Sequence, residues 1–184
     1  MLNEYREKLI ETLQKVNMDD YDRILEALSE VIYKFGEVFI VGNGGSSATA
    51  SHIVNDLAKM IPESTGKKVR VRCLSDNTPL ITAIANDLDY DYIFSEQVLG
   101  FMYPGDILIA LSGSGNSSNI INAVMEANKK GCTTIGLCGR DGGQLAQVAT
   151  LSLTVPVESM QLIEDVHLVI GHSLCLDLIE RSQA

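Results

Sequence analysis

Residues 37–47, Glu37-Val-Phe-Ile-Val-Gly-Asn-Gly-Gly-Ser-Ser47, place a short apolar strand directly before a loop of glycine and serine. The same order returns at residues 106–118, Asp106-Ile-Leu-Ile-Ala-Leu-Ser-Gly-Ser-Gly-Asn-Ser-Ser118. A helical pattern follows each loop, over about 47–60 and 119–130. Repetition of a buried strand, a small-residue loop and a helix is typical of a parallel α/β sheet.

The rest of the chain extends this pattern to five strands. Further strands are predicted at 69–74, 132–137 and 151–155, with helical stretches at 80–101, after 139–143 and at 160–181. Together they predict a three-layer α/β/α sandwich around a five-stranded parallel sheet. We expect one domain, 1–184, in which helices at 2–16 and 20–35 form an N-terminal extension (1–35) to an α/β core (36–184). The extension could pack on another subunit or simply cap the core.

Composition and charge exclude several classes of partner. The formal net charge of −10 argues against nucleic acid. No apolar run reaches membrane-spanning length, and the polar N-terminus does not resemble a signal peptide. Four well-separated cysteines (Cys73, Cys132, Cys138 and Cys175) lack metal-binding spacing, as expected of reduced core thiols. We therefore expect a cytoplasmic protein with no nucleic-acid or membrane partner.

The two small-residue loops are predicted to form an anion site. Ligands of open α/β sheets collect at the carboxyl ends of the strands, where the first N–H groups of the next helix point at them. Serine hydroxyls add donors, so Ser46, Ser112, Ser114 and Ser117 are candidate phosphate ligands. One such loop alone would indicate only a strand–helix connection, but two favour a phosphorylated sugar as ligand.

Neither loop has the pattern of a nucleotide site. The loops lack the lysine of a nucleoside-triphosphate-binding loop, and Gly42-Asn-Gly-Gly-Ser-Ser47 lacks the last glycine of the dinucleotide fingerprint. We therefore expect no nucleotide or organic cofactor.

Four segments together resemble the sugar isomerase (SIS) domain family: Gly42-Asn-Gly-Gly-Ser46, Asn86-Asp87, Ser112-x-Ser-Gly-Asn-Ser117 and Asp141-Gly-Gly143. Within that family, the chain is similar to the phosphoheptose isomerases along essentially its whole length. The resemblance implies a flavodoxin-like SIS fold and a homotetramer with sites shared between subunits. It also implies isomerisation of sedoheptulose 7-phosphate to D-glycero-D-manno-heptose 7-phosphate, a precursor of lipopolysaccharide or capsule heptose.

The resemblance also implies which residues bind the substrate. The four candidate serines hold the phosphate, and the Asn86–Asp87 pair lines the sugar site. The full expected set of substrate-binding residues is Asn43, Gly44, Gly45, Ser46, Asn86, Asp87, Ser112, Ser114, Ser117 and Glu164.

A ketose–aldose isomerisation needs one group that takes a proton from carbon and another that serves the neighbouring oxygens, commonly a carboxylate and an imidazole. His52 and Asp56 are four residues apart on one predicted helix, and Glu164 and His172 are eight apart on the last. By resemblance, Asp56 and His172 are the proton-transfer groups. His52, Asp56, Glu164 and His172 also resemble a zinc site of some members, and two histidines with two carboxylates are plausible zinc ligands. His167 has no matching role, and we expect it to be structural.

Three positions depart from the family pattern. Asp56 replaces a glutamate, Glu164 a glutamine, and Leu162 an arginine. The shorter side chain of Asp56 could leave its carboxylate about 1 Å short. Two alternatives stay open: an isomerase of a different sugar phosphate, and a non-catalytic relative that binds sugar phosphates or associates with a replication initiator. The acid at 56 and the histidine at 172 favour an enzyme.

Overall fold

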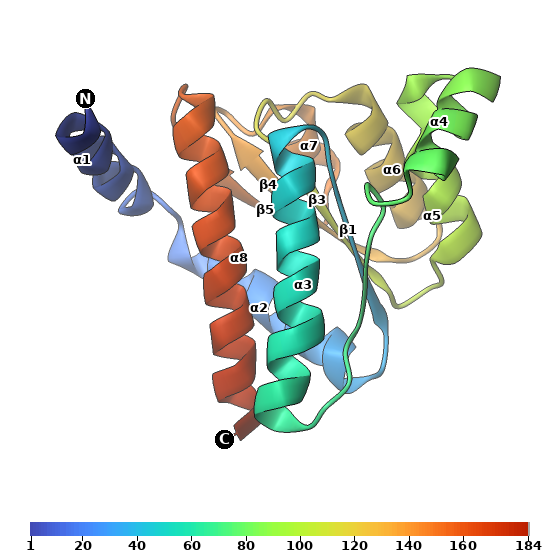
Figure 1. The fold of residues 1–184 in the computed structure, drawn as a ribbon, viewed down its shortest axis with the longest axis horizontal. Helices are drawn as coiled ribbons and strands as arrows, with labels where there is room; N and C mark the ends of the chain where they lie inside the picture. Colours follow the sequence, from blue (N-terminus) through green and yellow to red (C-terminus); the bar gives the residue numbers. More distant parts are fainter. Residues whose placement is uncertain (184) are drawn as a thin grey trace.

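The computed structural model describes residues 1–183, which form a parallel sheet between two layers of helices (Figure 1). The sheet contains β1 (Glu37–Gly42), β2 (Arg70–Cys73), β3 (Ile107–Ser112), β4 (Thr133–Gly139) and β5 (Leu151–Val155), in the order β2-β1-β3-β4-β5. All neighbouring strands pair in parallel. The predicted fold class is confirmed.

Alternate side chains of the strands supply the two cores. Val38 and Ile40 of β1 face one helix layer, whereas Phe39 and Val41 face the other. The first layer contains α2 (Met18–Tyr33), α3 (Gly45–Thr65) and α8 (Met160–Gln183). The second contains α5 (Ser95–Phe101), α6 (Ser118–Lys129) and α7 (Gly143–Val148). Because both faces are covered, β1 and β3 are buried along their whole length, which explains their continuous apolar sequences.

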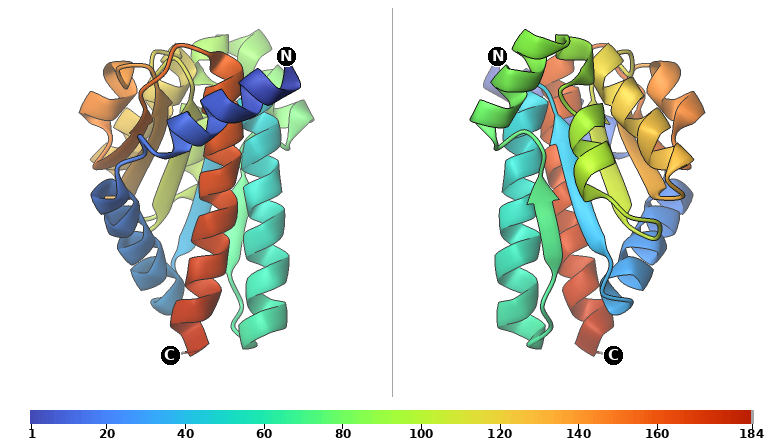
Figure 2. Two further views of the ribbon diagram at one scale, coloured as in Figure 1. Left: turned by 90° about the vertical axis from the view of Figure 1, so that its left-hand side faces the viewer. Right: turned by 90° about the vertical axis from the view of Figure 1, so that its right-hand side faces the viewer.

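The two N-terminal helices differ in their packing. Ile24 and Leu28 of α2 are almost fully buried in the same core as β1, so α2 is part of a helix layer. In contrast, α1 (Leu2–Leu13) crosses the outer side of α8 (Figure 2). The phenol of Tyr5 donates a 2.6 Å hydrogen bond to Asp165, which fixes α1 near the start of α8.

Two helical predictions had wrong boundaries. The helix predicted over 47–60 continues through Pro62 and ends where Gly66, at φ +71°, donates its N–H to the Pro62 carbonyl. The stretch 80–101 is divided into α4 (Thr78–Asp87), the 3-10 turn η1 (Tyr90–Tyr92) and α5. Asp89 begins η1 by accepting a hydrogen bond from the Asp91 N–H, and such local side-chain bonds compete with a continuous helix.

The predicted burial of the cysteines agrees with the structure. All four cysteines are buried and free, and burial raises the pKa of the Cys138 thiol to about 12. Among the described residues, no helix is both long enough and apolar enough to span a bilayer.

Candidate functional site

The strand order changes direction between β1 and β3, and open α/β sheets bind their ligands beside such a change of direction. β2 lies on one side of β1, whereas β3, β4 and β5 follow on the other side. The loop Gly42–Ser46 leaves the carboxyl end of β1, and the loop Ser112–Ser117 leaves the carboxyl end of β3. The two predicted phosphate loops therefore border the one switch point of the described sheet.

The second loop, Ser112–Ser117, has the hydroxyl groups of an anion cradle. Ser112 is buried, and its hydroxyl donates to the Ser117 Oγ at 3.3 Å. Ser114 Oγ accepts the Asn116 N–H at 3.2 Å. Ser117 is the N-cap of α6 but makes no side-chain capping bond. Its hydroxyl hydrogen and the N–H groups of Ser118 and Asn119 thus remain available to a ligand, whereas the Ile120 N–H is bonded within the turn.

A third loop, Asp141-Gly-Gly143, packs against the serine loop. Gly115 has φ +66°, and a Cβ at this position would overlap the Gly142 carbonyl oxygen. The Gly115 carbonyl accepts the Leu145 N–H at 2.8 Å, and Asn116 Oδ1 accepts the Gln144 N–H at 3.0 Å. The Asp141-Gly-Gly143 segment therefore fixes the shape of the serine loop.

The first loop is tied to the second by a pair of amides. Asn43 and Asn119 exchange two hydrogen bonds, of 2.8 and 3.0 Å, and the Tyr90 phenol also bonds to Asn43 Oδ1 at 3.1 Å. Ser46 is buried at the start of α3. Neither Asn119 nor Tyr90 is among the site residues predicted from the sequence. Asn119 lies two residues after the end of the serine motif at Ser117, and this proximity in sequence could have indicated its role.

The predicted pair Asn86 and Asp87 lies at the end of α4. The Asn86 amide donates to the Asp87 carboxylate at 2.9 Å, and both side chains are exposed. No residue of α4 is buried. Within one chain, neither side chain forms a hydrogen bond with the two loops, and their sugar-binding role stays a prediction.

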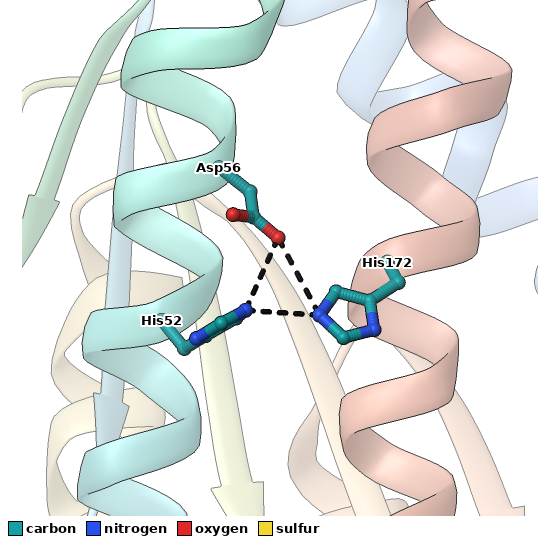
Figure 3. Close-up of side chains that lie close together, drawn as sticks. All are labelled: His52, Asp56 and His172. Atoms are coloured by element: carbon teal, nitrogen blue, oxygen red, sulfur yellow. Dashed lines mark hydrogen bonds and ion pairs between the residues drawn. The ribbon is translucent and has the colours of Figure 1, made fainter.

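Three predicted catalytic or metal-site residues come together between α3 and α8, which run parallel and side by side (Figures 1 and 3). The Nε2 atoms of His52 and His172 are 2.9 Å apart, and Asp56 Oδ2 lies 3.4 Å from the first and 3.6 Å from the second. Asp56 is buried, whereas nearly half of each imidazole side chain is exposed. One carboxylate thus bridges two accessible imidazoles.

This cluster also has the dimensions of a metal site. Zinc ligands at 2.0–2.1 Å in tetrahedral geometry lie about 3.3 Å from one another. The three distances of 2.9, 3.4 and 3.6 Å in the cluster bracket that value. Two imidazoles and one carboxylate form the ligand set of many catalytic zinc sites, which keep a fourth position open. His52, Asp56 and His172 therefore fit a divalent metal ion.

The structure does not bring Glu164, the fourth predicted ligand, to this cluster. Glu164 lies at the first loop instead: a Cβ added to Gly45 would be 2.7 Å from its Oε1. Eight helical residues separate Glu164 from His172, and at 1.5 Å per residue this is about 12 Å along α8. A carboxylate beside Gly45 is at the predicted substrate loop but not at the metal cluster of the same chain.

His167 has the structural role that we expected. It is 1% exposed, and its Nε2 lies 3.0 Å from the Cys138 carbonyl oxygen. Because a carbonyl only accepts, Nε2 must carry the proton. Burial lowers the pKa of His167 to about 4, so the imidazole is neutral at pH 7.

Comparisons with known proteins agree with the architecture and with the motifs. Residues 3–139 match the SIS domain family. The chain is 44% identical to a phosphoheptose isomerase of Sulfurimonas denitrificans over 79% of this chain and 73% of that protein. It is 37% identical to a probable phosphoheptose isomerase of Thermoplasma acidophilum, over 90% and 91% of the two chains.

Solved structures give the same result. The phosphoheptose isomerase of Neisseria gonorrhoeae superposes with a TM-score of 0.88 at 30% identity, over 96% of each chain. That of Francisella tularensis superposes with a TM-score of 0.91 at 28% identity, over 98% of this chain and 96% of that one. By sequence and by fold, the chain belongs to the SIS domain family and, within it, to the phosphoheptose isomerases.

Proposed function

We propose that this protein converts sedoheptulose 7-phosphate to D-glycero-D-manno-heptose 7-phosphate, for lipopolysaccharide or capsule heptose synthesis in the cytoplasm. The observation that carries the proposal is the pairing of a serine loop at the switch point with a carboxylate–imidazole cluster on the adjoining helices. Ser46, Ser112, Ser114 and Ser117 would hold the phosphate. Binding of the phosphate would position the sugar carbons for acid–base chemistry.

Asp56 and His172 are the proposed proton-transfer groups. A carboxylate with an imidazole 3.6 Å away can take a proton from one carbon and serve the oxygens of the neighbouring carbon. His52, Asp56 and His172 would also hold a zinc ion. Bound zinc would polarise the carbonyl or hydroxyl oxygens of the sugar.

We further propose a homotetramer in which each site is completed by more than one copy. The two imidazoles are half exposed on the outer side of α3 and α8, and α4 carries Asn86 and Asp87 without burying any residue. Glu164 is too far along α8 to meet His172 of its own chain. It would therefore reach a metal cluster from a second copy.

Turnover would be tested with sedoheptulose 7-phosphate, with and without zinc, by following aldose formation with proton NMR. Pentose and hexose phosphates run in parallel would identify a different preferred sugar. His172→Ala should abolish turnover, whereas Ser173→Ala, its neighbour on α8, should not. Ser114→Ala should mainly raise KM. Wild-type rates in His172→Ala, or no turnover of any sugar phosphate, would refute the proposed reaction.

Shared sites would be tested by mixing two inactive variants. Ser114→Asp places a carboxylate where the phosphate should bind, and His172→Ala removes the imidazole. If each site takes its loop and its cluster from different copies, dissociating and reassembling the two variants together should restore part of the activity. Either variant reassembled alone serves as the control. Reassembled mixtures that stay inactive would contradict shared sites.

A further inference from the structure

The amide pair between the first loop and α6 has only one possible orientation. Asn43 Nδ2 donates to Asn119 Oδ1 at 2.8 Å, and Asn119 Nδ2 donates to Asn43 Oδ1 at 3.0 Å. The Ile120 N–H also donates to Asn119 Oδ1, at 2.9 Å. An atom that accepts from a backbone N–H must be the amide oxygen, and this assignment fixes the orientation of both amides.

Tyr90 completes the hydrogen bonding of the Asn43 carbonyl. Its phenol lies 3.1 Å from Asn43 Oδ1, and because that oxygen cannot donate, the phenol must. A carbonyl oxygen has two lone pairs. Asn119 occupies one and Tyr90 the other. The group of the Asn43 side chain that remains for a ligand is the second N–H of its amide.

This saturation determines what Asn43 can offer to a substrate. A sugar phosphate presents acceptor oxygens on its phosphate, and a donor in the first loop can bind them. Without the Tyr90 phenol, the Asn43 side-chain carbonyl would need a second hydrogen-bond donor from water or from the ligand. We propose that Tyr90 is a positioning residue, which holds Asn43 as a hydrogen-bond donor for the sugar phosphate. This inference rests on the proposed function to the extent that a sugar phosphate must bind at the two loops.

The turn that carries Tyr90 is held independently of its phenol. Asn122 of α6 donates to the Asp91 carbonyl at 3.0 Å, and the Asp89 carboxylate accepts the Asp91 N–H at 2.9 Å. Ile93 and Phe94, directly after η1, are buried in the second core. Removing one hydroxyl group from Tyr90 should therefore leave the turn in place.

Tyr90→Phe is the test, and Tyr92→Phe is its matched control. Tyr90 and Tyr92 belong to the same turn and are 54% and 48% exposed, but the Tyr92 phenol has no hydrogen bond among the described residues. Loss of one neutral hydrogen bond corresponds to about a 2- to 10-fold change in binding. For Tyr90→Phe we expect KM for sedoheptulose 7-phosphate to rise by that factor, with kcat unchanged within about twofold. The Tyr92→Phe enzyme should match the wild type.

An unchanged KM in Tyr90→Phe would overturn the inference, as would an equal rise in Tyr92→Phe, because then the turn and not the phenol would matter. If the wild type binds the sugar phosphate but does not isomerise it, the proposed reaction fails. In that case titration calorimetry of the same three proteins gives the dissociation constants. A weaker affinity in Tyr90→Phe alone would then still support the inference, and equal affinities would overturn it.

Discussion

The buried imidazole of His167 should make the protein lose stability as the pH falls. In the folded protein its Nε2–H bonds to Cys138, and Nδ1 has no partner among the described residues. Protonation would place a charge in the core, which is why burial lowers the pKa from 6.5 to about 4. In the unfolded chain the same imidazole is free to take up a proton near pH 6.5.

The sign and size of the effect follow from these two values. Between pH 6.5 and 4 the unfolded state binds the proton and the folded state does not, so the stabilisation present above pH 6.5 is lost as the pH falls toward 4. At pH 5 about 97% of unfolded chains but only about 9% of folded chains carry this proton. The free energy of unfolding should therefore drop by about 2 kcal/mol between pH 7 and pH 5 because of His167 alone.

The measurement compares the wild type with His167→Gln, whose amide nitrogen can still donate to Cys138 but does not titrate. Urea unfolding of both proteins at pH 7 and pH 5, at one protein concentration, cancels the contributions of all other titrating groups. The wild type should lose about 2 kcal/mol more than the variant. Equal losses would refute the reasoning. If the variant does not fold, the His167 ring resonances of the wild type decide, because they should not titrate between pH 8 and pH 5.5.

Three further predictions concern the serine loop, helix α5 and the metal cluster. Gly115→Ala should displace the serine loop, because its Cβ would meet the Gly142 backbone, and KM should rise at least 10-fold, since displaced donors no longer fit the phosphate. Gly100→Ala, with open space around it in α5, should instead stabilise the fold by about 0.5–1 kcal/mol in urea unfolding. Asp56→Asn should weaken zinc binding at least 10-fold in a chelator competition, and an unchanged affinity would remove Asp56 from the metal site.

The strands could be predicted closely because a parallel sheet covered on both faces leaves little choice of residue. Every predicted strand overlaps an observed one, and Ile107–Leu111 is buried throughout, as its apolar sequence indicates. The breaks between α4, η1 and α5 were less visible, because they depend on single side-chain caps such as Asp89. Tyr90 was missed for a related reason. Its hydrogen bond to Asn43 joins residues 47 positions apart, and no local pattern reveals it.

The contrast between His52–Asp56 and Glu164–His172 shows how far helical spacing alone can be used. Residues four apart differ by about 40° around the helix and 6 Å along it, so two side chains can meet at one ligand. Residues eight apart differ by about 80° around the helix and 12 Å along it, and here the Glu164 carboxylate lies at Gly45 whereas the His172 imidazole lies at Asp56. The predicted four-residue metal set came from the resemblance to a zinc site of some family members, and it included both pairs without regard to their axial spacing. The axial distance separates them, and Glu164 therefore lies outside the cluster that His52, Asp56 and His172 form in its own chain.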